Sequence, residues 1–209
     1  MSKNLFAFAT SAWTALGIAA TMAGAAVSEK WELNLVFLLG VLVAGIAGVI
    51  IALKSDVPIV SLFGYMLVAI PFGLMLGPVV ALYTMASVVR VFFVTTGMVV
   101  ALGIVGAVIP DSLEGLGSWL FGGLVALLIG LLIVPIAGMF GVPIKEAMTI
   151  LDWVGVVLFS GYVVYDWNRA MRVPFTLDNS IDCALAVYLD WINLFIRLLE
   201  LTGTKKSDD

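Results

Sequence analysis

The chain has 209 residues, of which 63% are hydrophobic and only 11% are charged. Because soluble domains carry about 25% charged residues, this composition indicates an integral membrane protein. The chain has no histidine and a single cysteine, Cys183, which excludes an internal disulfide and the zinc, haem and triad chemistry that depends on histidine or paired cysteines. The net charge of -4 is thinly spread and excludes a nucleic-acid-binding surface.

Polar breaks divide the sequence into seven apolar runs, each near the roughly 20 residues that a helix needs to cross a bilayer. The first run follows Lys3 like a signal peptide, but it is longer than the apolar core of such a peptide, so we interpret it as a retained first helix. The loops are short, and we expect one all-α domain over residues 1–209 with a short tail at 202–209. The predicted spans are Leu5–Val27, Leu33–Leu53, Ile59–Leu82, Ala86–Ile109, Trp119–Phe140, Ala147–Met171 and Ile181–Leu201.

Prolines interrupt two of these spans. Pro71 and Pro78 fall inside the third span, and Pro135 falls inside the fifth. Proline removes a backbone hydrogen-bond donor, and its ring clashes with the preceding helical turn. We therefore expect the third and fifth helices to bend or break at these positions.

The seventh span is the most polar of the seven. A charged side chain at the centre of a bilayer costs roughly 2.5–3.5 kcal/mol on insertion scales, so a stripe of such side chains cannot face lipid. We therefore predict seven transmembrane helices, with the last helix enclosed by the other six and its polar stripe, including Asn193, lining a pore. At about 100° per residue, the residues of this stripe lie on one helix face: Asp190, Asn193, Arg197 and Glu200.

Successive spans run in opposite directions, so the position of a charge along its span gives its depth in the membrane. Four charges lie at comparable depths, toward the side opposite the start of the first span. We expect Asp152 to pair with Arg90 or with Arg197, either as a structural salt bridge or as a gate on that side. The four charges, which we consider as intramembrane ion pairs, are Arg90, Asp152, Arg197 and Glu200.

Two aspartates stand near each other across the hairpin formed by the sixth and seventh spans. At ~1.5 Å per residue, Asp166 lies about 9 Å and Asp190 about 16 Å from the turn, a difference that tilt and side-chain reach can close. Two carboxylates at low dielectric share one proton and titrate as a unit. In a chain without histidine, this pair is the best candidate for a proton switch near neutral pH. We expect Asp178 or Asn179 to cap the seventh helix.

A cluster of residues at the end of the chain matches a known pattern. Tyr165 and Asp166 close the sixth span, and the run Ala-Val-Tyr-Leu-Asp-Trp-Ile-Asn-Leu-Phe follows at residues 186–195. With the pair Leu198 and Leu199 beyond it, this segment closely resembles the C-terminal signature of the Bax inhibitor-one family, also called the transmembrane Bax inhibitor motif family. The match is strong over residues 159–201.

This resemblance implies a seven-helix bundle whose last helix is wrapped by two layers of three helices. It also implies a pH-sensitive calcium leak, gated by aspartates on the sixth and seventh helices that map onto Asp166 and Asp190 and whose oxygens contact the calcium ion. A basic residue at the end of the second helix can latch this pair in the family, and Lys54 is the nearest equivalent here. Calcium and protons are then transported ions rather than cofactors.

Three functions therefore compete. We favour a passive, non-enzymatic cation leak embedded in the lipid bilayer as a multi-pass protein of the cell inner membrane. The second is an intramembrane aspartyl protease, suggested by Tyr165 before Asp166 and by Tyr188-Leu189-Asp190, although its Gly-x-Gly-Asp and Pro-Ala-Leu elements are absent. The third is a non-conducting regulator or scaffold, whose protein partners the sequence does not identify.

Overall fold

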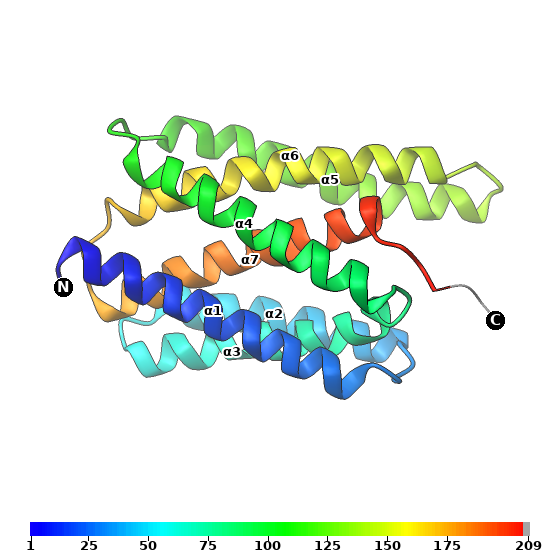
Figure 1. The fold of residues 1–209 in the computed structure, drawn as a ribbon, viewed down its shortest axis with the longest axis horizontal. Coiled ribbons are helices and arrows are strands. Elements are labelled where there is room, and N and C mark those ends of the chain that lie inside the picture. The colour runs from blue at the N-terminus through cyan, green and yellow to red at the C-terminus, as the bar shows by residue number, and fades with distance from the viewer. Residues whose placement is uncertain (207–209) are drawn as a thin grey trace. The chain divides into compact units, whose positions relative to one another are not determined.

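The computed structural model describes residues 1–206, and the tail residues Ser207, Asp208 and Asp209 lie outside the described residues. Over the described part the chain forms seven α-helices (Figure 1), which confirms the predicted all-α fold. The predicted tail begins where the last helix ends. The helices are α1 (Lys3–Ser28), α2 (Leu35–Lys54), α3 (Pro58–Val80), α4 (Met85–Val108), α5 (Glu114–Met139), α6 (Lys145–Ala170) and α7 (Leu177–Thr202).

Six of the helices, α1 to α6, are long and apolar enough to cross a membrane by length and composition. The seventh, α7, is equally long but is not among the six, because charged residues are spaced along its whole length. The chain is therefore a multi-pass membrane protein in which α7 is the helix least suited to face lipid. The charged residues of α7 are Asp178, Asp182, Asp190, Arg197 and Glu200.

The helix bounds differ most from the prediction at the start of α5. We predicted a start at Trp119, but the helix begins at Glu114 and includes the glycines at positions 115 and 117. A Cβ atom at Gly117 would lie 2.7 Å from the hydroxyl oxygen of Tyr165 on α6. Glycine at this position therefore serves the close approach of two helices rather than a turn.

The prolines do not break their helices. The helix α3 runs through Pro71 and Pro78, and α5 runs through Pro135. Of the two predicted outcomes, a bend or a break, the break is therefore wrong, because a helix in a membrane has no water to satisfy the backbone groups that a break would expose. In a membrane, continuing the helix through a proline is therefore less costly than breaking it.

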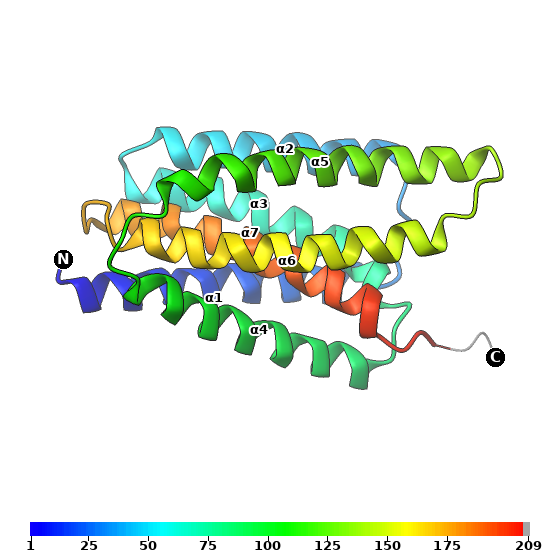
Figure 2. The same cartoon turned by 90° about the horizontal axis from the view of Figure 1, so that it is seen from above.

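The contacts of the chain cluster in two compact units. The first unit holds Met1–Thr84, Ala170–Leu189 and the end of the chain from Lys205, and the second holds Met85–Arg169 and Asp190–Thr204. In the first unit, α3 packs against both α1 and α2 (Figures 1 and 2). The first half of α7 thus belongs to the unit of α1 to α3, and the second half belongs to the unit of α4 to α6. That the chain forms a single domain stays a prediction.

In the first unit, buried aromatic residues join α7 to α1 and α3. The Tyr188 side chain is fully buried, and its hydroxyl oxygen lies 2.6 Å from Oγ1 of Thr21. Because Thr21 donates its own proton to the carbonyl oxygen of Ala69 at 3.0 Å, Tyr188 is the donor to Thr21. The ring of Tyr188 also packs edge-on against that of Tyr65, with centroids 5.4 Å apart.

In the second unit, Trp191 joins α7 to α4. Its indole nitrogen donates a hydrogen bond to Oγ1 of Thr96 at 3.1 Å. Its ring packs edge-on against Phe92 of α4 and stacks on Phe195 of α7, with centroids 5.5 Å and 5.3 Å apart. Each half of α7 is therefore buried within its own unit, which confirms the prediction of an enclosed last helix.

The start of α7 is capped by a residue that we did not predict. Oγ1 of Thr176 accepts a hydrogen bond from the backbone N–H of Asn179 at 3.1 Å, the geometry of an N-cap. The prediction of Asp178 or Asn179 as the cap is therefore wrong. Asp178 is buried instead, and its Oδ1 accepts a hydrogen bond from the hydroxyl of Ser61 on α3 at 2.7 Å.

Close packing of α4 on α6 gives a first test of the fold. A Cβ atom at Gly106 would collide with the carbonyl oxygen of Val164, whereas a Cβ atom at Gly97 on the same helix would meet nothing within 4 Å. We expect Gly106→Ala to lower the free energy of unfolding by on the order of 1–3 kcal/mol. Gly97→Ala should leave it unchanged or raise it by up to about 1 kcal/mol. Thermal denaturation of both variants in detergent measures the difference, and equal stabilities would contradict this packing.

Candidate functional site

The second unit brings Asp166 of α6 and Asp190 of α7 together. Their carboxyl groups lie within hydrogen-bonding reach of each other. Asp190 is only 4% exposed, while Asp166 is half-buried near the end of α6. Oδ2 of Asp190 is buried without a hydrogen-bond partner among the described residues. A buried carboxyl oxygen without a partner is costly, so it marks a place where a proton or a cation would be stabilised.

Two further side chains of α6 act on this carboxyl pair. Tyr162 interacts electrostatically with both carboxyl groups, and it lies one turn before Asp166 on the same helix face. Arg169, which is exposed at the end of α6, places a positive charge near Asp166. We did not predict Tyr162, although its spacing of four residues from Asp166 was a usable signal.

Asn168 holds the end of α6 against the connection between α4 and α5. This side chain is 2% exposed, and its Nδ2 donates to the carbonyl oxygens of Gly106, Ile109 and Asp111 at 3.1–3.3 Å. Its Oδ1 accepts a hydrogen bond from the backbone N–H of Leu113 at 3.1 Å. These bonds satisfy backbone groups at the end of α4 and before α5, and they fix the turn of α6 that carries Asp166.

Replacing Asn168 by leucine should therefore destabilise the protein. The change removes four hydrogen bonds, one of which, to the carbonyl oxygen of Gly106, is buried. We expect a loss of roughly 2–4 kcal/mol in the free energy of unfolding. The matched control is Asn179→Leu, which removes one bond to the carbonyl oxygen of Pro174 and should cost about 1 kcal/mol. Thermal denaturation in detergent compares the two, and an Asn168→Leu protein as stable as the control would refute this role.

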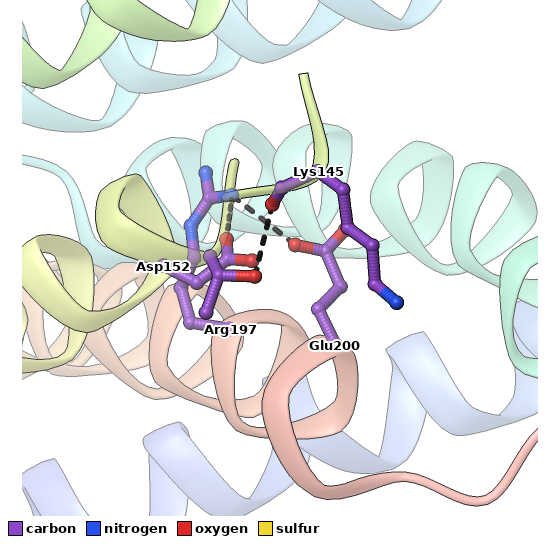
Figure 3. Close-up of polar contacts among 5 residues, drawn as sticks. Lys145, Asp152, Arg197 and Glu200 are labelled. Atoms are coloured by element: carbon purple, nitrogen blue, oxygen red, sulfur yellow. Dashed lines mark hydrogen bonds and ion pairs between the residues drawn. The ribbon is translucent and has the colours of Figure 1, made fainter. Parts of the chain in front are cut away.

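At the other end of α6 and α7, the structure forms an ion-pair cluster (Figure 3). Nη1 of Arg197 lies 2.9 Å from Oδ1 of Asp152 and 3.4 Å from Oε2 of Glu200. Asp152 is 5% exposed, and the stem of Arg197 packs against Gly155. Of the two partners that we considered for Asp152, the structure thus provides Arg197.

The remaining predicted residues have other surroundings. Arg90 donates from Nη2 to the carbonyl oxygen of Thr202 at 2.7 Å, so its charge lies at the C-terminal end of α7, where helix dipoles favour cations. Lys54 is exposed in the last turn of α2 and belongs to the first unit. Asn193 is half-buried on α7 and has interaction partners. The roles of Lys54 as a latch and of Asn193 in a pore stay predictions.

The carboxyl pair does not belong to a larger cluster of metal ligands among the described residues. Among residues 1–206, no group of three or more acidic, histidine or cysteine residues is arranged to hold a metal ion. Calcium in proteins takes six to eight oxygen ligands. The Asp166 and Asp190 pair offers at most four carboxyl oxygens, so any calcium here would keep part of its water shell.

The fold and the site together define a class: multi-pass, all-α membrane proteins with two adjacent carboxyl groups on their last two long helices. The family model described as "Inhibitor of apoptosis-promoting Bax1" matches residues 4–207 of this chain. The chain therefore belongs to the Bax inhibitor family, as the resemblance at its C-terminal end implied.

Several curated proteins are similar to this chain. Inner membrane protein YbhL of Escherichia coli is 30% identical over 99% of this chain and 88% of its own length. Bax inhibitor 1 of Schizosaccharomyces pombe is 28% identical over 66% of this chain and 50% of its own length. An uncharacterised protein of Borreliella burgdorferi is 28% identical over 65% of this chain and 60% of its own. None of these names is that of an enzyme.

Proposed function

We propose that this chain is a pH-sensitive calcium leak of the inner membrane, gated by a proton shared between Asp166 and Asp190. The observation that carries the proposal is the carboxyl pair, in which Asp190 is buried and one of its oxygens has no hydrogen-bond partner among the described residues. The name of the similar Escherichia coli protein supports the inner membrane as the location. The chain belongs to the Bax inhibitor family, and the resemblance to that family implies a calcium leak.

The electrostatic repulsion between the two carboxylates is large enough to operate a gate. A carboxylate has no hydrogen-bond donor. Two carboxyl groups within hydrogen-bonding reach of each other are therefore held together by a proton on one of them. If both lose their protons, the repulsion between the charges is about 4 kcal/mol at ~4 Å and an effective dielectric constant near 20. Because 1.4 kcal/mol is about a tenfold change in an equilibrium, this repulsion is large enough to shift α6 and α7 between two arrangements.

The same pair suits passage of calcium better than storage. Calcium prefers oxygen ligands, and carboxylates are the strong oxygen ligands at this site. Two carboxylates are too few to replace the whole water shell, and Arg169 opposes a cation near Asp166. Weak binding that still neutralises the pair is what conduction requires, since an ion must be able both to enter and to leave.

The proposal is tested with purified full-length protein in liposomes. We expect calcium influx above that of empty liposomes, with smaller flux of sodium. A helical peptide reporter in the same liposomes should stay intact, since the chain lacks the second half of the aspartyl-protease motif. Cleavage of the reporter that a transition-state analogue blocks would favour the protease, and the absence of any flux would favour a scaffold.

A further inference from the structure

An apolar groove on the first unit plays no part in the function proposed above. Its volume is about 310 Å³, within the range of roughly 300–1,000 Å³ that is typical of sites for small ligands. Helices α2 and α3 form its walls, and α7 contributes one residue. Its lining contains no charged or hydrogen-bonding side chain and includes Leu42, Gly45 and Ile46 of α2, Val68 and Phe72 of α3, and Leu189 of α7.

Gly45 is the residue that leaves this groove open. A Cβ atom at Gly45 would lie 3.3 Å from Cε1 of Phe72, so a larger side chain here would occupy the groove. Leu42 and Ile46 are 55% and 54% exposed. The groove therefore opens outward, toward the lipid that surrounds the span α2, and not into the interior of the unit.

We propose that this groove binds one acyl chain of a membrane phospholipid. The groove lies along the middle of α2, at the depth of the hydrocarbon core, where neither water nor headgroups are present. From Leu42 to Ile50 it extends about 12 Å at ~1.5 Å per residue. A lining without polar side chains offers nothing to a polar ligand, whose groups would be left unpaired at a cost of a few kcal/mol.

The size of the groove argues against a second copy of the chain as its occupant. Stable protein interfaces bury about 1,200–2,000 Å², far more than a groove two turns long can provide. Contact with Leu189 distinguishes the groove from the ordinary lipid-facing surface of α2, because a bound chain would touch α7, the most buried helix of the protein. A lipid chain would thus be held on three helices at once.

A photoreactive phospholipid tests the proposal directly. The lipid carries a diazirine in the middle of one acyl chain, and the wild-type protein is irradiated in liposomes and mapped by mass spectrometry. We expect Ile46 and Phe72 to be labelled several-fold more than Val43, which is 65% exposed on α2 outside the groove. Gly45→Leu should reduce this labelling to the level of Val43. The matched control Gly40→Leu should not, because a Cβ atom at Gly40 meets nothing within 4 Å.

Each other outcome overturns the proposal. Equal labelling of Ile46 and Val43 in the wild type would mean that only bulk lipid is present. Equal loss of labelling in Gly40→Leu would mean that the effect is unspecific. Suppression by added long-chain fatty acid but not by added phospholipid would identify a different ligand, and cross-links between two α2 helices would identify a second copy. If Gly45→Leu does not fold, Ile46→Trp takes its place, because it narrows the groove from the exposed edge, and the labelling is then measured at Phe72 alone.

Discussion

Protein with Asp190→Asn is expected to conduct calcium at a rate that no longer changes with pH. Asparagine keeps the shape of the side chain but cannot lose or gain a proton in the physiological range, so the pair with Asp166 no longer shares one. Asp190 is almost fully buried, which makes its charge the most costly at the site. The measurement is calcium uptake into liposomes at mildly acidic and mildly alkaline pH.

The matched control for this experiment is Asp56→Asn. Asp56 is exposed in the connection between α2 and α3, so its neutralisation makes the same chemical change without touching the pair. We expect this control to keep the pH dependence of the wild type. If Asp190→Asn also kept it, the carboxyl pair would not be the gate, whatever the protein conducts.

Replacing Arg197 by methionine is expected to produce the largest loss of stability. The change removes the cation that pairs with Asp152 at 2.9 Å and leaves that buried carboxylate without compensation. Removing one partner of a buried ion pair costs about 3–5 kcal/mol. Thermal denaturation of the purified variant in detergent measures the loss.

Two controls separate this ion pair from a general effect of removing charge. Arg90→Met removes one exposed hydrogen bond to the carbonyl oxygen of Thr202 and should cost only about 0.5–1.5 kcal/mol. The double variant Arg197→Met with Asp152→Leu should recover most of the lost stability, since apolar residues often replace buried ion pairs without penalty. A double variant as unstable as Arg197→Met alone would show that Asp152 is not the cause.

The fold could be predicted well from the sequence because the apolar composition of a membrane-spanning helix distinguishes it clearly from the loops. Long apolar runs separated by polar breaks predict helices directly, and the polar residues of α7 predicted that this helix is buried. The hairpin spacing was enough to place Asp166 near Asp190, as the structure does. Depth alone could not choose the partner of Asp152, because Arg90 and Arg197 lie at similar depths, and only the side-chain geometry selected Arg197.

Features that depend on contacts between distant segments could not be predicted from periodicity. Asn168 binds backbone groups about 55–62 residues earlier in the chain, so no local pattern marks it. The groove at Gly45 depends on where the ring of Phe72 lies, and the apolar run of α2 carries no sign of it. The cap of α7, by contrast, is a local feature whose position we predicted two or three residues too late, since Thr176 rather than Asp178 or Asn179 caps the helix.

The pH profile of calcium flux through the purified protein tests the central claim most directly. Calcium uptake into liposomes is measured from mildly acidic to mildly alkaline pH, with wild-type protein and with protein that carries both Asp166→Asn and Asp190→Asn. The shared-proton gate predicts a flux that varies with pH in the wild type and is flat in the double variant. A wild-type flux that does not vary with pH, or a double variant that keeps the wild-type profile, would contradict it.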